Sequence, residues 1–171
     1  MCQWENLFPS PFSPEAWDPV PVNPITSDRL FLEVPPDEQF APPRTLLRDI
    51  QVLVVDDDED SLDIFAATLE AFGAKVFKSR TAKDALAVLK AAPVNVLVSD
   101  LMMPGQDGLW LMEQVRQLRA ESGGGVPAVA VTAHYSRYDL NSAFGEGFNL
   151  YLPKPLDLFG FVRAIARLAG R

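Results

Sequence analysis

Hydrophobic positions along the chain follow two different spacings from residue 49 onward. Short apolar runs rich in β-branched residues are typical of buried parallel strands, and five such runs occur, at 50–55, 75–78, 95–99, 128–132 and 149–152. After each run, apolar residues recur every three or four positions, which predicts an amphipathic helix. The predicted helices lie at about 62–72, 81–92, 108–119, 137–144 and 156–168.

Strands and helices therefore alternate five times within about 120 residues, which is typical of an α/β fold. Right-handed crossovers leave few ways to wind such a sheet. We expect the flavodoxin-like solution, a doubly wound five-stranded parallel sheet in the order 2-1-3-4-5 with five helices. Ligands of such folds bind at the carboxyl ends of the strands, so the residues that follow each strand are the candidates for function.

The first 48 residues have a different composition. They contain ten of the fifteen prolines, and proline at this density prevents long helices. Disordered linkers are usually poor in aromatic residues, but this segment carries Trp4, Phe8, Phe12, Trp17, Phe31 and Phe40. We interpret residues 1–48 either as a largely disordered extension or as one that docks on the domain at 49–171 or on a partner. The alternation at 29–34 is compatible with a short strand.

Charge and cysteine content narrow the classes of function. The formal net charge is −8, which argues against broad electrostatic binding to nucleic acid or to an anionic membrane. No apolar run approaches the roughly 20 residues of a transmembrane helix, and Met1 to Ser10 lack the pattern of a secretory signal. The single cysteine, Cys2, fits a reducing compartment. We expect a cytoplasmic protein that binds neither nucleic acid nor membrane directly.

Polar residues stand at the ends of four of the five predicted strands. Asp56-Asp57-Asp58 follow the first strand, Asp100 follows the third, Thr132 ends the fourth, and Lys154 follows the fifth. Carboxylates gathered at one edge repel each other unless a cation neutralises them. Mg²⁺ prefers oxygen ligands and often pairs with phosphate oxygens. An aspartate beside Mg²⁺, a lysine and a hydroxyl group suits the role of a phosphoryl acceptor.

Four motifs carry a resemblance to a known family. They are Val-Val-Asp-Asp at 54–57, Ser-Asp-Leu-Met-Met-Pro-Gly-Gln-Asp-Gly at 99–108, Val-Thr-Ala at 131–133 and Pro-Lys-Pro at 153–155. In this order and on these elements, they resemble the CheY-like receiver domain of response regulators in two-component signal transduction. The resemblance spans residues 49–171. It implies a stand-alone phosphoprotein of a phosphorelay, which undergoes only its own phosphorylation and dephosphorylation and is not otherwise an enzyme.

The resemblance also implies which residues carry the phosphoryl group and the metal. Asp100 would be the phosphorylated residue. Asp56 and Asp57 would hold Mg²⁺ together with Asp100, and the backbone carbonyl of Met102 would be a further ligand. The identity of the Met102 side chain is therefore no departure from the family pattern.

Five further residues receive a role from the same resemblance. Thr132 would donate its hydroxyl to the phosphoryl group, and Lys154 would pair with that group. Tyr151 matches the switch aromatic of the family, and the small Ala133 would leave room for it to rotate inward. Pro155 matches a position that usually follows a cis peptide bond.

The partners implied by the resemblance are proteins. A histidine kinase or a histidine phosphotransfer protein would supply the phosphoryl group, and a downstream protein target would receive the signal. The face formed by the predicted fourth helix, fifth strand and fifth helix would change on phosphorylation and is a possible homodimer interface.

Some polar residues near the strand ends have simpler interpretations. Asp58, Glu59 and Asp60 are expected to favour the N-terminus of the first helix through its dipole. Asp107-Gly108 is read as a turn and helix start. His134 is read as a solvent-facing loop residue, with the alternative that it influences attack of water on the phosphorylated aspartate.

Two other classes of function compete with the phospho-acceptor switch. Asp56-x-Asp58 after an apolar strand also resembles the nucleophile motif of haloacid-dehalogenase-type phosphatases, with Thr132 and Lys154 as partners. That class needs a further acidic pair after the lysine, and only Asp157 follows. The second competitor is a pseudo-receiver, a protein-interaction module that is not phosphorylated.

Overall fold

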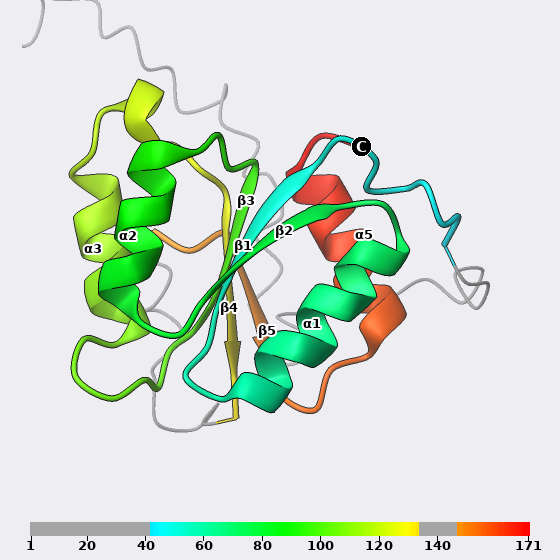
Figure 1. The fold of residues 1–171 in the computed structure, drawn as a ribbon, viewed down its shortest axis with the longest axis horizontal. Helices are drawn as coiled ribbons and strands as arrows, with labels where there is room; N and C mark the ends of the chain where they lie inside the picture. Colours follow the sequence, from blue (N-terminus) through cyan, green and yellow to red (C-terminus); the bar gives the residue numbers. More distant parts are fainter. Residues whose placement is uncertain (1–41, 134–146) are drawn as a thin grey trace, which may run out of the picture. The chain divides into compact units, whose positions relative to one another are not determined.

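A parallel sheet forms the centre of the fold (Figure 1). The computed structural model describes residues 42–133 and 147–171, and the strands lie in the order β2-β1-β3-β4-β5. Their bounds are β1 Gln51–Val55, β2 Lys75–Ser79, β3 Val96–Asp100, β4 Ala128–Thr132 and β5 Leu150–Pro153. All four strand pairs are parallel. The predicted doubly wound sheet in the order 2-1-3-4-5 is therefore confirmed.

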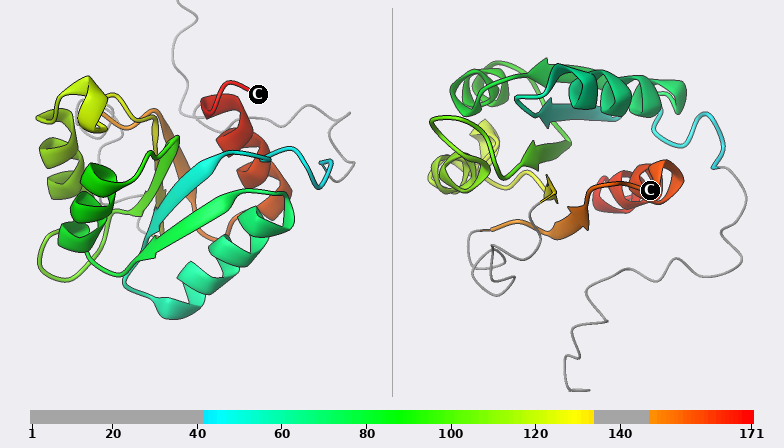
Figure 2. Two further views of the ribbon diagram at one scale, coloured as in Figure 1. Left: turned by 45° about the horizontal axis from the view of Figure 1, so that its top comes forward. Right: turned by 90° about the horizontal axis from the view of Figure 1, so that it is seen from below.

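Helices cover both faces of this sheet. The helices α1 (Glu59–Ala71) and α5 (Leu158–Leu168) pack on one face, and α2 (Ala82–Ala91) and α3 (Gly108–Arg116) pack on the other, as Figures 1 and 2 show. These correspond to four of the five predicted helices. No helix within the two described ranges is long and apolar enough to cross a membrane.

Three predictions about segments of the chain fall outside the described residues. They are the fourth helix at 137–144, the short strand at 29–34, and the disorder or docking of residues 1–41.

Short polar side chains fix where the helices begin. Asp58, Thr81, Asp107 and Asp157 each accept a hydrogen bond from a backbone N–H in the first turn of the following helix, as N-capping residues do. The helix start predicted at Thr81 is confirmed. The last helix begins at Leu158, two residues later than predicted, because the Asp157 carboxylate caps its first turn.

The end of α3 also differs from the prediction. It ends at Arg116, three residues before the predicted end, and a short 3-10 helix, η4 (Ala120–Ser122), follows. The amide of Leu118 donates to the carbonyl oxygen of Val115 at 3.0 Å, so the chain tightens to three-residue spacing here. The periodicity of apolar residues does not distinguish such a turn from a further turn of α-helix.

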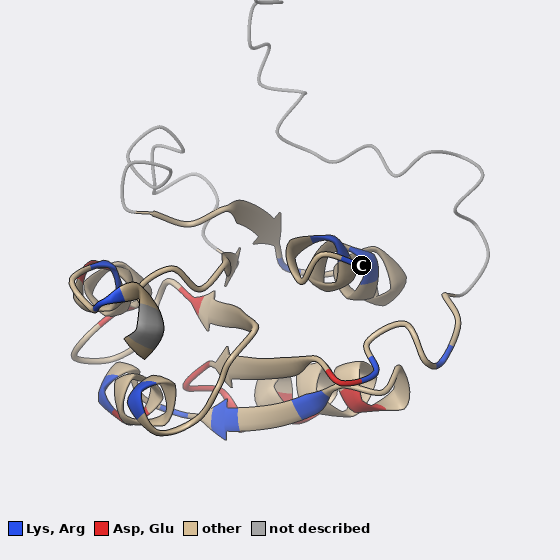
Figure 3. Cartoon of the chain, turned by 90° about the horizontal axis from the view of Figure 1, so that it is seen from above, with Lys and Arg blue, Asp and Glu red and all other residues tan. Residues whose placement is uncertain are grey.

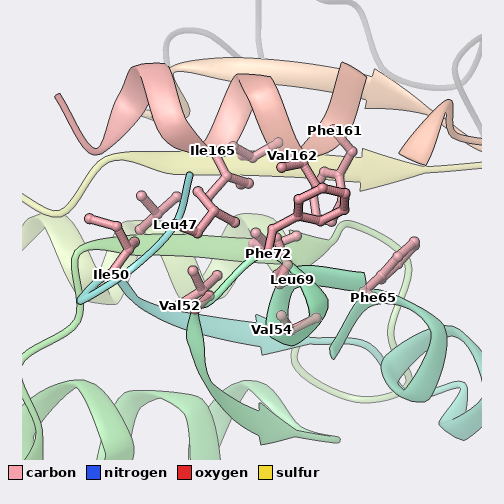
Figure 4. Close-up of a cluster of buried hydrophobic side chains, with 14 of the residues drawn as sticks. Leu47, Ile50, Val52, Val54, Phe65, Leu69, Phe72, Phe161, Val162 and Ile165 are labelled. Atoms are coloured by element: carbon pink, nitrogen blue, oxygen red, sulfur yellow. The ribbon is translucent and has the colours of Figure 1, made fainter. Parts of the chain in front are cut away.

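The core consists of one hydrophobic cluster on each face of the sheet. Figure 4 shows the cluster beneath α1 and α5, where Val52 and Val54 of β1 face Phe65 of α1 and Phe161 of α5. The two rings lie 5.5 Å apart between centroids. Leu47 joins this cluster and is fully buried, although it falls in the segment interpreted as an extension. Its amide donates to the carbonyl oxygen of Phe72 at 2.9 Å.

Leu47 gives a test of how far the packed domain extends toward the N-terminus. We expect Leu47→Ala to lower the free energy of unfolding by about 2–5 kcal/mol, because it leaves a cavity between the end of α1 and α5. Urea denaturation of the full chain measures this. The control is Leu46→Ala, since Leu46 is only partly buried. Equal stability of the two variants would contradict the packing described here.

Candidate functional site

Acidic residues gather at the carboxyl ends of β1 and β3, where Figure 3 shows red segments on neighbouring strands. The two strands are paired so that Val55 lies opposite Ser99, and the next residues, Asp56 and Asp100, therefore lie side by side where the two strands end. Carboxylate oxygens of Asp56, Asp57 and Asp100 all lie within 4.8 Å of one another. The sequence-predicted carboxylates thus form one cluster.

Lys154 joins this cluster from the end of β5. Its Nζ lies 2.6 Å from Asp56 Oδ2 and 3.0 Å from Asp100 Oδ2, so one ammonium bridges two carboxylates. The backbone N–H of Lys154 donates to the carbonyl oxygen of Thr132 at 3.0 Å, which fixes the lysine to the end of β4. The peptide bond between Lys154 and Pro155 is cis, as expected.

Backbone amides orient the remaining carboxylate oxygens. Asp56 Oδ1 accepts from the amide of Asp58 at 3.0 Å, and Asp100 Oδ1 accepts from the amide of Met102 at 3.0 Å. Each aspartate therefore has one oxygen on Lys154 and the other on the loop that follows its own strand. This arrangement fixes both carboxylate planes before any ligand binds.

Burial sets the electrostatics of the cluster. The exposed fraction is 2% for Asp56 and 9% for Asp100. Burial raises the pKa of the Asp56 carboxyl, and the hydrogen bond from Lys154 opposes that rise. Burial lowers the pKa of the Lys154 ammonium, but its contacts with Asp56 and Asp100 outweigh burial and hold that pKa above its ordinary value. With all four groups ionised, three carboxylates and one ammonium leave two net negative charges.

This donor set fits a hard divalent cation. The three side chains offer only oxygen atoms, they lie close enough to share one ion, and a charge of +2 would balance the site. Mg²⁺ keeps several waters and uses few protein ligands, which suits a cluster of three carboxylates at the surface end of a sheet.

The other predicted residues lie at neighbouring positions. Thr132 ends β4 and is buried, and Met102, two residues after Asp100, is exposed. Ala133 is exposed. Tyr151 belongs to β5 and is 7% exposed, in the cluster on the α2 and α3 face of the sheet. The buried side chain of Tyr151 is thus on the inner side of the fold.

The simpler interpretations of nearby acids are confirmed. Asp58 Oδ2 accepts from the hydroxyl of Ser61 at 2.7 Å and from its amide at 3.1 Å, and these two hydrogen bonds, the hydroxyl's first, lower the pKa of Asp58. Asp107 Oδ1 accepts from the amide of Trp110 at 2.8 Å. Both carboxylates serve the starts of helices. His134 lies outside the described residues.

One basic residue near the site was missed by the sequence analysis. The guanidinium of Arg80 donates to the backbone oxygen of Asp57 at 3.3 Å and pairs with Glu59 at 3.4 Å. Arg80 follows β2, which is an edge strand of the sheet. The sequence feature that could have identified Arg80 is its position directly after a predicted strand. Its long side chain is what allows the guanidinium to reach Asp57.

Comparison with known proteins places this fold and site in a family. The family model of the response regulator receiver domain matches residues 52–166. An uncharacterized 14.6 kDa protein of Leptolyngbya boryana is 40% identical over 119 residues, which cover 70% of this chain and 89% of the relative. The DNA-binding transcriptional regulator NtrC of Salmonella typhimurium is 34% identical over 116 residues, which cover 68% of this chain but 24% of the regulator.

A solved structure shows the same fold. The receiver domain of the sensor histidine kinase PA1611 from Pseudomonas aeruginosa, which has a magnesium ion coordinated in its active-site cleft, is 24% identical. Its TM-score is 0.65, and the match covers 71% of this chain and 98% of the solved one. This likeness shows the fold, and the match to the family model over residues 52–166, more than half of the chain, shows that the chain belongs to the response regulator receiver family.

Proposed function

We propose that this chain is a phospho-acceptor response regulator, which takes a phosphoryl group on Asp100 from a phosphohistidine of a histidine kinase or histidine phosphotransfer protein. The observation that carries the proposal is the cluster of Asp56, Asp57 and Asp100 within 4.8 Å, bridged by Lys154. An aspartate so placed is oriented, close to a cation, and surrounded by groups that suit an incoming phosphoryl group.

The side chains of the site supply most of the chemistry. A carboxylate oxygen of Asp100 attacks phosphorus as the bond between phosphorus and the donor imidazole breaks, and the imidazole takes a proton from solvent. The ammonium of Lys154, now 3.0 Å from Asp100, would pair with a phosphoryl oxygen. The Thr132 hydroxyl would donate to another. Mg²⁺ held by Asp56, Asp57, Asp100 and the carbonyl of Met102 would neutralise charge on the phosphoryl oxygens.

The site favours a switch over a turnover phosphatase. In the phosphatase interpretation, Asp58 would act on the substrate as the second acid of the motif. Its Oδ2 instead accepts from both the amide and the hydroxyl of Ser61, at 3.1 Å and 2.7 Å, so it serves as the cap of α1. Asp100, which the phosphatase motif does not use, lies in the centre of the cluster. The protein is therefore proposed to undergo only its own phosphorylation and dephosphorylation.

The signal would leave through a protein surface. Phosphorylation would shift the equilibrium between two conformations of the protein, which differ at the face formed by the predicted fourth helix, β5 and α5. A downstream protein target, or a second copy of the chain, would bind that face. We propose that this takes place in the cytoplasm, without direct binding to nucleic acid or membrane.

Intact mass spectrometry tests the acceptor. After incubation with acetyl phosphate and Mg²⁺, we expect a gain of about 80 Da, one phosphoryl group, that is lost without Mg²⁺ and lost in Asp100→Asn. Asp60→Asn, which changes an exposed acid on α1 outside the cluster, should label like the wild type. Labelling of Asp100→Asn would contradict the assignment of the acceptor. A wild type that neither acetyl phosphate nor a phosphorylated histidine phosphotransfer protein can label would favour the pseudo-receiver.

A further inference from the structure

Tyr151, the proposed switch aromatic, is packed against a second aromatic ring. Its ring centroid lies 5.6 Å from that of Phe148, at an interplanar angle of 64°. Phe148 is 3% exposed and belongs to the same buried cluster. Edge-on aromatic pairs at this distance are more stable than their buried area alone accounts for. Phe148 therefore favours the orientation of Tyr151 that the structure shows.

A partly buried arginine, Arg116, holds the residue before Phe148. From the end of α3, the guanidinium of Arg116 donates to the carbonyl oxygen of Gly147 through Nη2 at 2.6 Å and through Nε at 3.2 Å. Its Nη1 donates to the carbonyl oxygens of Gly124 and Val126 at 2.8 Å and 2.9 Å. One side chain thus ties the approach to β5 to α3 and to the loop before β4.

The backbone at Gly147 is shaped to receive this arginine. Gly147 has a φ of +95°, and a Cβ atom there would lie 2.8 Å from Arg116 Nε. Two residues further on, Asn149 Oδ1 accepts from the amide of Ala128 at 2.8 Å, and the amide of Asn149 donates to the carbonyl oxygen of Ala128. Phe148 is therefore anchored on both sides, through Gly147 to α3 and through Asn149 to β4.

We infer that Phe148, held by Arg116 through Gly147, is a positioning residue that keeps Tyr151 buried before any phosphoryl transfer. This inference rests on the proposed function, because it concerns the switch residue of that site. A Tyr151 side chain that turns outward loses the ring contact, while Phe148 cannot follow it or fill the space. The equilibrium between buried and exposed Tyr151 is accordingly shifted toward the buried side in the unphosphorylated chain.

Nitration of tyrosine by tetranitromethane, mapped by peptide mass spectrometry, measures the exposure of Tyr151 in the unphosphorylated full chain. We expect Phe148→Leu, which keeps an apolar side chain but removes the ring, to raise the nitration rate of Tyr151 by about threefold to tenfold. Leu89→Ala is the control for general loosening, because Leu89 lies in the same cluster but on α2. It should leave the nitration rate of Tyr151 near that of the wild type.

A second pair of variants tests the anchor independently. Arg116→Lys keeps the charge but cannot bridge three carbonyl groups, so Tyr151 should again react faster than in the wild type. Arg119→Lys changes an exposed arginine just beyond the same helix and should have no effect. Unchanged reactivity in Arg116→Lys, or in a folded Phe148→Leu, would overturn the inference, as would an equal rise in Leu89→Ala. All these nitration experiments use the unphosphorylated protein and can be repeated in Asp100→Asn. Failure of the inference about Phe148 can therefore be distinguished from failure of the phospho-acceptor proposal.

Discussion

Replacing Lys154 with methionine is expected to lower the free energy of unfolding of the metal-free protein by about 2–4 kcal/mol at neutral pH. The ammonium of Lys154 lies between Asp56 and Asp100, at 2.6 Å and 3.0 Å. Methionine fills much of the same space but leaves two largely buried carboxylates facing each other without a cation. The value is below that for a fully buried pair, because the Lys154 side chain is 21% exposed. Urea denaturation in the presence of a chelator measures it.

The pH dependence of this loss in the free energy of unfolding shows whether it arises from the unpaired carboxylates or from lost packing. The pKa of Asp56 is already raised by burial, and Lys154 opposes the rise, so removing the lysine raises it further. A carboxyl with a raised pKa in the folded state loses stability as pH rises from its unfolded pKa through its folded pKa. The deficit of Lys154→Met should therefore shrink as pH is lowered to about 4.5, and added Mg²⁺ should also reduce it.

An exposed ion pair provides the control for this variant. Lys78 Nζ lies 2.8 Å from Asp63 Oδ1, but both side chains are more than half exposed. Solvent screens such a pair, so Lys78→Met should show little change and no such pH dependence. If Lys154→Met were equally destabilised at pH 7 and at about pH 4.5, and with Mg²⁺, the cause would be a contact that does not involve the carboxylates, such as that of Lys154 Nζ with the Phe65 ring, 5.8 Å from the ring centroid. The electrostatic account of the site would then be wrong.

The order of the strands and the positions of their ends could be predicted from the sequence. Helices cover both faces of the sheet, so each buried strand appears in the sequence as a continuous apolar run. All five residues of β3 and all five of β4 are buried, so their ranges differ from the prediction by one residue or none. Parallel strands also deliver their carboxyl ends to one edge, which is why Asp56, Asp100 and Lys154 were selected before their distances were known. The roles assigned to them by resemblance stay predictions.

What the sequence could not supply depends on distances between remote segments. Leu47 has no periodic neighbours that mark it as buried, and only its contact with the end of α1 makes it part of the core. Phe148 and Tyr151 stand three residues apart, and in a regular strand such residues point to opposite faces. They meet because Phe148 precedes the start of β5 at Leu150, where the alternation of a strand does not set the direction of its side chain.

Gly108 illustrates the same limit and carries the second large effect. Asp107-Gly108 was predicted to be a turn and helix start, and this is confirmed. That prediction did not require glycine at position 108, and a positive φ does not require it either. The first turn of α3 passes so close to the end of β3 that a Cβ atom on Gly108 would clash with the backbone oxygen of Asp100 and lie 2.9 Å from Leu101 Cα.

Gly108→Ala is therefore expected to destabilise the protein by about 1–3 kcal/mol, the usual cost of overpacking, and to weaken Mg²⁺ binding as well. The colliding atoms belong to the backbone of Asp100, the proposed acceptor, and of Leu101, so relief of the clash must move either α3 or the end of β3 at Asp100. Urea denaturation measures the first effect, and isothermal titration with Mg²⁺ measures the second. Gly125→Ala is the matched control, because a Cβ atom there meets nothing within 4 Å.

The two readouts together decide how the clash is relieved. If α3 yields, stability falls while the carboxylates of Asp56, Asp57 and Asp100 keep their spacing, and the Kd for Mg²⁺ stays near that of Gly125→Ala. If Asp100 yields, its contact with Lys154 at 3.0 Å is disturbed and Mg²⁺ binding weakens along with stability. We expect the second result, because α3 is fixed at its other end by the four hydrogen bonds of Arg116. Wild-type stability and Mg²⁺ affinity in Gly108→Ala would contradict the close approach of α3 to Asp100.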